Sequence, residues 1–452
     1  MRKVLSLVLV MLMTITVIGS ITPAMADANE LKFYDNNSTA ARTAFFEKVF
    51  DEYYEATGVR FVYEGQPWAN SATTVTTMFA GGNGPDVYTF VGNEEVAVKN
   101  GWLYAIDDYI AENSEKFVDM VTGYYWVNEK AAYGHNYCFP DATMAKGIYY
   151  RKDWVEEIGY EIPTGKDWNW NAFWDLAEKL TDPEKNRYGF AFRGGSGAEA
   201  WSQGYPNAYA HTYEYDPETL EWTADARYEG LKAYFDTYTN GYAPADSLNW
   251  GWSEQIDGFC SGLVGLFYND TDCFPFIMDR MEEGTWGVLP IPYDNEGFGT
   301  TGDALNATYA YAISASSENV EACIGLMDFL YEPDRNTEYC IMMGSIPVRK
   351  DAAENEYFAE DGPLGAFVTS LSNPDFLLGG QLTGMNKTEW AGYTFDFAGE
   401  MQMYLLGELT YDEFFEGWKE WNQTAITNYL TENPDKIRDI IKMSDFFGSD
   451  AE

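Results

Sequence analysis

The sequence has 452 residues, of which 46% are hydrophobic and 22% charged, a composition typical of a folded protein with two or three domains. Against 28 Lys and Arg it has 72 Asp and Glu, a formal net charge of −44. So acidic a chain repels phosphate backbones and anionic headgroups, which argues against nucleic-acid binding and membrane-surface roles. It has only two histidines, His135 and His211, which disfavours a histidine-built metal site and a Ser-His-Asp enzyme.

Residues 1–26 have the pattern of a secretory signal peptide. Arg2 and Lys3 precede an apolar run from Val4 to Met13, and Ala24 and Ala26 form a small–x–small cleavage site. Nothing later reaches the roughly 18 consecutive apolar residues of a membrane span. No cysteine stands at the cleavage site for a lipid anchor. We therefore predict a protein exported to the periplasm or to the extracellular face of the bacterial membrane.

Strand and helix signals alternate at the start of the mature chain. The pattern predicts strands over 31–34, 59–63 and 87–90, with a helix that ends at Gly58 between the first two and another over 71–80 between the last two. This β-α-β-α-β order favours a parallel sheet covered by helices. The ligand-facing loops of such a sheet lie at the carboxyl ends of its strands.

The same alternation begins again further along the chain. We predict strands over 147–150 and 188–192, helices up to Ile158 and over 171–180, and an exposed hairpin within 213–225. Helices over 319–330, 398–406 and 411–429 follow. Because no low-complexity linker separates these blocks, the sequence predicts two lobes joined by short crossing segments.

The five cysteines are an odd number, with spacings that match neither a zinc ribbon nor a disulfide scaffold. We expect small buried side chains, with a Cys260–Cys273 pair as the alternative.

Several segments, in this order, carry a family resemblance. They are Gly84–Val87 (GPDV), Leu103–Ile110 (LYAIDDYI), Gly147–Asp153 (GIYYRKD), Trp286–Pro292 (WGVLPIP) and Gly344–Arg349 (GSIPVR). Together the chain resembles the family 1 extracellular solute-binding proteins of ABC importers, the group that contains the maltose-binding protein.

The resemblance implies an α/β fold, the two-lobed type II periplasmic-binding-protein fold, in which each lobe is a mainly parallel sheet flanked by helices and the ligand cleft lies at the hinge. The N-terminal lobe would hold residues 27–145 plus 303–350, and the C-terminal lobe 146–302 plus 351–452. It further implies a carbohydrate ligand, expected to be an oligosaccharide, ABC permease subunits as partners, a monomer, no cofactor, no metal and no catalytic step.

Sugar sites combine aromatic rings with polar side chains, because sugars have flat apolar faces rimmed by hydroxyls. In the first lobe the candidates follow predicted strands: Asn36 and Asn37 after the first, Trp68 after the second, and Asn93 and Glu94 after the third. An Asx turn is the alternative for the first two, and a solvated acid at a helix N-terminus for Glu94.

In the second lobe the candidates lie after strands or ahead of the last helices. Asp270 and Asp272 stand where the resembling family places a ring, and the Gly-rich turn after Arg193 lacks the Lys-Ser/Thr of a phosphate loop. The candidates are Arg193, Trp201, Trp250, Trp252, Asp270, Asp272, Trp390 and Tyr393.

Three alternatives remain at this stage. A secreted glycoside hydrolase would need two carboxylates about 5–9 Å apart. The same fold could instead bind a cation such as a polyamine or an amino sugar, with calcium near 294–303 as a variant. A scaffold that attaches to insoluble polymers would use its rings without any lobe closure.

Overall fold

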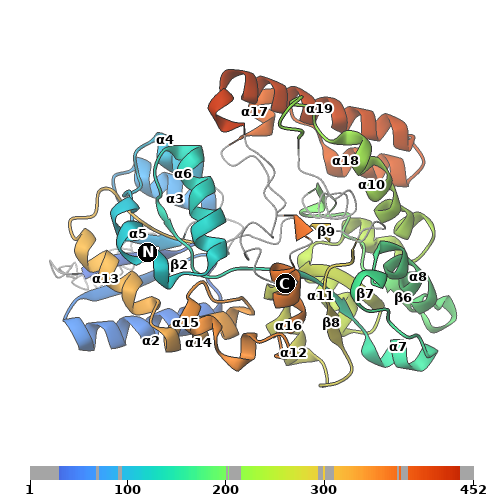
Figure 1. Ribbon diagram of the computed structural model, residues 1–452, viewed down its shortest axis with the longest axis horizontal. Coiled ribbons are helices and arrows are strands. Elements are labelled where there is room, and N and C mark those ends of the chain that lie inside the picture. The colour runs from blue at the N-terminus through green and yellow to red at the C-terminus, as the bar shows by residue number, and fades with distance from the viewer. Residues whose placement is uncertain are drawn as a thin grey trace, which may run out of the picture.

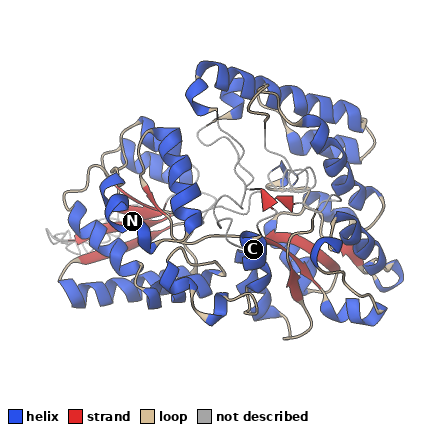
Figure 2. Cartoon of the chain, in the orientation of Figure 1, coloured by secondary structure: helices blue, strands red, loops and turns tan. Residues whose placement is uncertain are grey.

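The computed structural model describes residues 30–67, 71–89, 94–199, 202, 215–293, 299–300, 310–373, 376–377 and 385–437. These residues form two separate sheets, each with helices around it, so the molecule has two halves (Figures 1 and 2). Across the described ranges, no helix combines the length and apolar character needed to cross a bilayer. The predicted signal peptide and part of the predicted calcium segment lie outside them.

The first sheet has the order β2-β1-β3-β10-β4. Its members are β1 (Glu30–Asp35), β2 (Arg60–Gly65), β3 (Val87–Thr89), β10 (Tyr311–Ile313) and β4 (Cys138–Phe139). β1 pairs in parallel with β2 and β3, as the alternating pattern predicts. β10 comes from much later in the chain and lies antiparallel between β3 and β4.

Helix α2 (Ala40–Thr57) begins and ends where its local sequence predicts. The Thr39 hydroxyl accepts a hydrogen bond from the Arg42 amide, and Gly58 ends the helix in the left-handed region at φ 75°. Its apolar face packs on β1, with the Phe33 and Phe46 ring centroids 4.7 Å apart. The other elements on this half are α3 (Ser71–Ala80), α4 (Glu94–Lys99), α5 (Asp107–Asn113), the π-helix η3 (Val121–Tyr125), α6 (Trp126–Tyr133), α13 (Val320–Leu330), α14 (Pro333–Met343) and α15 (Lys350–Ala353).

The second sheet has the order β6-β7-β5-β8. It contains β5 (Lys146–Tyr150), β6 (Tyr188–Phe190), β7 (Val264–Asp270) and β8 (Gly287–Leu289). The expected parallel pairing holds for β6 and β7, but β5 runs antiparallel to both β7 and β8. The reason is that β5 enters this sheet directly from the first one, at the edge where β7 ends.

Helices surround the second sheet largely as predicted. They are α7 (Lys152–Ile158), α8 (Trp170–Leu180), α10 (Ala224–Thr239), α11 (Trp252–Cys260), α12 (Phe274–Arg280), α16 (Gly365–Ser372), α17 (Lys387–Ala391), α18 (Phe397–Leu405) and α19 (Tyr411–Glu432). A two-residue parallel pair, β9 (Gly299–Thr300) and β11 (Phe376–Leu377), lies apart. The predicted hairpin is a single antiparallel bridge between Tyr215 and Trp222, because the Asp216 side chain closes the turn locally.

All five cysteines are free thiols, four of them buried, so the Cys260–Cys273 pairing is not formed.

The chain crosses from β4 to β5 through residues 140–145. Thr143 in this crossing segment exchanges two 2.8 Å backbone hydrogen bonds with Ile346, which joins it to the segment after α14. One cluster of buried apolar residues includes Phe33 of the first sheet and Phe267 of the second. The two halves are therefore connected by a shared core as well as by chain.

We predict that Gly189→Ala strongly destabilises the protein. An added Cβ would lie 1.7 Å from the Ala177 carbonyl oxygen, since β6 packs backbone to backbone on α8. Overpacking of this kind costs about 1–3 kcal/mol, and here the obstacle is backbone. Urea unfolding measures the loss. Gly417→Ala is the matched control, because its nearest neighbour is a Phe395 ring atom at 3.1 Å and alanine favours a helix.

Candidate functional site

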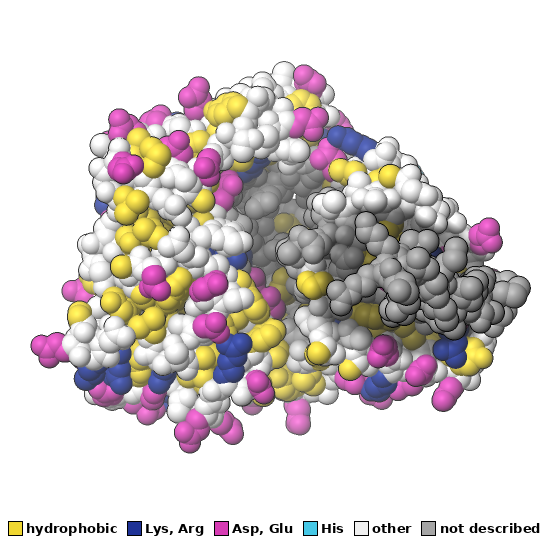
Figure 3. Space-filling model, turned by 180° about the vertical axis from the view of Figure 1, so that it is seen from behind, with side chains coloured by type: hydrophobic (Ala, Val, Ile, Leu, Met, Phe, Trp, Pro, Cys, Tyr) yellow, Lys and Arg dark blue, Asp and Glu magenta, His cyan; other side chains and the backbone are white. Residues whose placement is uncertain are grey.

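The topology brings two polar edges together at the crossing segment. β1 and β3 are parallel and β4 has the same direction as β3, so the carboxyl ends of all three lie where the chain leaves for β5. On the other side, β6 and β7 end at the edge where Lys146 begins β5, with Lys146 opposite Asp270 in the register. The surface is hollowed between the two halves, while acidic side chains are scattered over the rest of the drawn face (Figure 3).

A buried ion pair organises the first edge. Arg42 Nη2 lies 2.8 Å from Asp35 Oδ1 and Nε 2.9 Å from Oδ2, and both side chains are almost completely buried. The Tyr63 hydroxyl and the Thr89 hydroxyl donate to the same carboxylate at 2.8 and 3.1 Å. Burial by itself raises the pKa of Asp35, but Arg42, the Asn37 backbone amide and the Tyr63 hydroxyl outweigh it and lower the pKa below its usual value.

The ion pair continues into the crossing segment. Arg42 Nη1 donates to the Tyr339 hydroxyl at 2.6 Å, and that hydroxyl donates to Asp141 Oδ2, also at 2.6 Å. A second tyrosine of this region, Tyr331, donates to the Pro140 carbonyl at 2.6 Å. Side chains of the first lobe therefore hold residues 140 and 141: Tyr339 of α14, itself bonded to Arg42 of α2, and Tyr331 in the turn before α14.

Asn36 and Asn37 have different surroundings within the same turn. Asn36 is buried. Its backbone amide donates to Thr89 Oγ1 at 2.7 Å, and its side-chain Nδ2 donates to the Thr89 carbonyl. Asn37 is partly exposed, and its amide donates to Asp35 Oδ1 at 3.1 Å. The Asx turn expected as the alternative is thus made by Asp35, and Asn37 is the side chain of this turn that reaches solvent.

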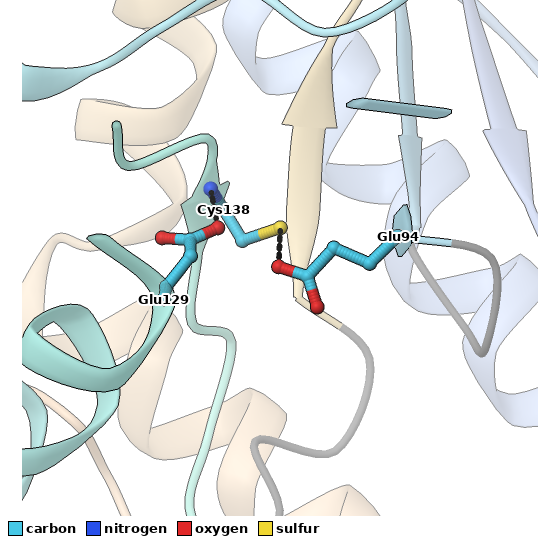
Figure 4. A group of neighbouring side chains, drawn as sticks. All are labelled: Glu94, Glu129 and Cys138. Carbon is cyan, nitrogen blue, oxygen red and sulfur yellow. Dashed lines mark hydrogen bonds between the residues drawn. The ribbon is translucent and has the colours of Figure 1, made fainter. Parts of the chain in front are cut away.

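Glu94, which is half-buried, lies in an acidic cluster with the buried Glu129 and Cys138 (Figure 4). Glu129 accepts from the Cys138 amide and from Asn136 Nδ2, each at 3.0 Å, and the Cys138 thiol donates to Glu94 Oε1 at 3.8 Å. Burial and the charge of Glu129 raise the pKa of Glu94 well above its usual range, and burial also raises that of Glu129. Glu94 stands at the N-terminus of α4, as the alternative has it, but it is half-buried and its carboxyl lies beside Glu129 and Cys138.

Among the described residues, these three also form the group whose possible metal-ligand atoms lie close together. Their carboxylate oxygens and thiol sulfur are within 4.8 Å of one another. The chemistry does not favour an ion. Both oxygens of Glu129 already accept hydrogen bonds from protein donors, and the raised pKa values of Glu94 and Glu129 favour protonated carboxyls, which are poor metal ligands.

The second edge carries acidic and basic side chains that lie close to one another, beside the indole ring of Trp252. Lys146 Nζ is 3.9 Å from Asp270 Oδ1, with both side chains nearly buried. Burial lowers the pKa of Arg193 to about 10, although the charges of Asp270 and Asp272 favour its charged form. Burial raises the pKa of Asp272, although Trp252, Arg193 and Lys146 favour its charged form. Four predicted residues, Arg193, Trp252, Asp270 and Asp272, therefore share one edge with Lys146.

The glycine-rich turn after Arg193 packs its backbone closely against the backbone of residues 247–250. Gly194 and Gly195 donate to the carbonyls of Ser247 and Trp250 at 3.0 and 2.9 Å, and a Cβ at either glycine would lie 2.5–2.6 Å from the facing backbone. Trp250 is buried against Gly258, whereas the ring of Trp252 is partly exposed and meets Phe276 edge-on at 5.1 Å. The two tryptophans, similar in sequence, thus differ in accessibility.

Trp390 and Tyr393 lie away from the sheet edges, at α17 and just after it. Trp390 packs edge-on against Tyr429 at 5.3 Å, and Tyr393 is 43% exposed. Trp68, Asn93 and Trp201 lie outside the described residues. Lys146, Glu129 and Asp141 belong to these clusters but were not predicted, since each acquires its neighbours only through pairing of distant segments.

Comparison with known proteins agrees with this architecture. Residues 36–336 match the model of the bacterial extracellular solute-binding protein family. The chain belongs to that family. A mannitol-binding protein of Pseudomonas aeruginosa is 22% identical over 304 residues, covering 64% of this chain and 65% of the relative.

Solved structures show the same fold. An ABC transporter solute-binding protein of Thermotoga lettingae, bound to α-D-tagatose, gives a TM-score of 0.71 at 19% identity, covering 88% of this chain and all of the other. The GacH receptor of Streptomyces glaucescens, known unliganded and with acarbose, gives 0.69 at 17% identity over 89% and 98% of the two chains. The predicted two-lobed α/β fold is confirmed.

We predict that Arg42→Met lowers the free energy of unfolding by about 3–5 kcal/mol near neutral pH, because it leaves the Asp35 charge buried without its partner. The lowered pKa of Asp35 means that its stabilising effect is present above its usual value of 3.8 and is lost as the pH falls through the lowered pKa. The loss in the variant should therefore shrink in acid.

The matched control for Arg42→Met is Lys48→Met, which removes a cation from the same helix α2. Lys48 pairs with Glu338 on α14 at 2.7 Å, but both side chains are about half exposed. Such a pair contributes at most about 1 kcal/mol. Equal losses in the two variants, measured by urea unfolding, would contradict the role assigned to the buried pair.

A second prediction concerns pH and the acidic cluster. Because the pKa of Glu94 is raised in the folded protein, its contribution to stability is full below its usual value of 4.5 and is lost as the pH rises through the raised pKa. Glu94→Gln should therefore gain stability relative to the wild type as the pH rises. A stability difference between Glu94→Gln and the wild type that does not change with pH in urea unfolding would contradict the prediction.

Proposed function

We propose that this protein is the extracytoplasmic receptor of an ABC importer that binds a carbohydrate between the two polar edges and delivers it to the permease subunits. The proposal includes export by the predicted signal peptide and the predicted lobe limits. The observation that carries it is the meeting of the two edges at the crossing segment, with Asn37 on one side and Trp252 beside Asp272 on the other.

The charges of these edges support a neutral ligand. Asp35 is paired with Arg42, Asp270 with Lys146, and Asp272 has a raised pKa in the presence of Arg193. A cationic solute such as a polyamine is best bound by a carboxylate that has no cation beside it. Hydroxyl groups, in contrast, can donate to a paired carboxylate and accept from a cation, and an indole ring suits the apolar face of a sugar.

The relatives support the same class of ligand. Their names and descriptions refer to tagatose, acarbose and mannitol, which share a dense array of hydroxyl groups. For this chain we propose an oligosaccharide, since the edges end on two different lobes and a chain of sugar units would span them.

The carboxyl pair of the acidic cluster does not have the arrangement of a glycoside hydrolase. A hydrolase holds two carboxyls about 5–9 Å apart with the sugar between them. Glu94 and Glu129 instead contact each other within 4.8 Å and share hydrogen bonds with Cys138. The proposal is therefore binding without a catalytic step, and sustained release of reducing ends from oligosaccharides by the pure protein would contradict it.

A thermal-shift screen over monosaccharides, oligosaccharides, amino acids, peptides and polyamines tests the ligand class. A ligand that binds only the folded state raises the unfolding midpoint as its concentration increases. We expect at least one carbohydrate to do so. A shift with polyamines or amino acids and with no carbohydrate would show that the proposed class is wrong.

For the sugar with the largest shift, we expect Trp252→Ala to weaken binding about tenfold in isothermal titration calorimetry, in line with the loss of one stacked ring. The control is Trp102→Ala, which truncates a partly exposed ring stacked on Phe79 at 5.0 Å, near the amino end of β3. Unchanged affinity in Trp252→Ala would remove this ring from the site.

A further inference from the structure

The two lobes also touch at a place distant from the crossing segment. Lys436 lies in the 3₁₀ turn η9 (Pro434–Lys436), which follows α19 of the second lobe. Its Nζ donates to the carbonyl oxygens of Ala131 and Ala132 at 2.5 and 2.9 Å, and these belong to the last turn of α6 on the first lobe. Figure 1 shows α17 and α19 at the top of the view, near α4 and α6.

The carbonyls that Lys436 contacts are the ones that a helix end leaves without partners. Gly134 ends α6 in the left-handed conformation, and its amide donates to the Lys130 carbonyl. Ala131 and Ala132 are among the remaining last-turn carbonyls, where the helix dipole favours a cation. The Lys436 side chain is 21% exposed, so the contact is only partly shielded from water.

The residue after Lys436 is anchored on its own lobe. Ile437 packs against the apolar cluster of the second lobe, whose members include Tyr429 and Leu430 of α19. Consecutive residues thus hold opposite lobes: the side chain of Ile437 contacts the second lobe and that of Lys436 the first. A movement that separates the lobes at this rim must break the two hydrogen bonds of Lys436.

A second attraction between charges crosses the same rim. Lys99 at the end of α4 pairs with Glu95, and Glu389 on α17 of the other lobe adds an attraction to the same ammonium group. At this rim Lys436 contacts the end of α6, and Lys99 on α4 and Glu389 on α17 attract each other at longer range.

We propose that Lys436 is an interlobe latch that sets the balance between closed and open arrangements of this protein before any ligand binds. On one side of the cleft the lobes are then joined by the chain itself, at residues 140–145. On the other side, at the rim, they are joined by hydrogen bonds that can break and re-form. Since an equilibrium of this kind scales the apparent affinity by the fraction of molecules in the competent state, the latch would also tune binding.

The test measures the lobe separation directly, in the full mature chain without sugar, so its result does not depend on the proposed ligand class. Spin labels are placed at Val127 on α6 and Glu416 on α19, whose side chains are 47% and 71% exposed. The background is Cys260→Ser, because the other four thiols are buried. Pulsed dipolar spectroscopy then gives the distance distribution between the labels.

We expect Lys436→Met to shift this distribution to longer distances, and Lys436→Arg, which keeps a cation with several donors, to leave it near the wild type. The matched control is Lys232→Met, whose ammonium group pairs with Asp236 within α10 at 2.8 Å. Equal distributions for the wild type and Lys436→Met would overturn the latch, and so would an equal shift in Lys232→Met.

Salt gives a second readout that needs no substitution at the rim. At about 1 M salt the Debye length falls to about 3 Å, which weakens a partly exposed contact between an ammonium group and a helix end. The wild-type distribution should then move toward that of Lys436→Met, whose own distribution stays unchanged. A salt response equal in both proteins would contradict the proposal.

Discussion

The buried ion pair between Asp35 and Arg42 is the constraint on which the rest of the site depends. Asp35 ends β1, and its carboxylate gathers donors from α2, from β2 through Tyr63 and from β3 through Thr89. A charge that is taken out of water requires such partners, because an unpaired buried carboxylate costs several kcal/mol. The carboxyl end of the first sheet is consequently a rigid platform, and the turn with Asn37 is built on it.

The same pair carries this rigidity into the hinge. Arg42 reaches Tyr339 on α14, and Tyr339 reaches Asp141 in the crossing segment, so the first lobe holds the start of that segment by side chains as well as by the chain. On the far side of the segment, Lys146 begins β5 and pairs with Asp270. The crossing residues therefore run between two buried ion pairs, one in each lobe.

The sequence predicts those parts of the fold whose causes are local. Helix α2 and Gly58 were predictable because apolar periodicity and a left-handed glycine act within one turn. The position of β10 between β3 and β4 and the reversed direction of β5 arise from pairing between distant segments, which no local pattern encodes. The same limit applies to the site: Arg193 and Asp270 follow strands and were predicted, whereas Glu129 gained its role only from burial beside Glu94.

The latch and the hinge hold the lobes together by different kinds of contact. The hinge is covalent and supported by Asp141 and Thr143, so it keeps its contacts when the lobes move. Lys436 contacts backbone carbonyls at a helix end, a noncovalent interaction that weakens with salt. A cleft closed by one permanent and one reversible boundary can admit a ligand by releasing the weaker one. The free energy of that release sets how often the unliganded cleft opens, and through the fraction of molecules in the binding-competent state it scales the affinity for any ligand.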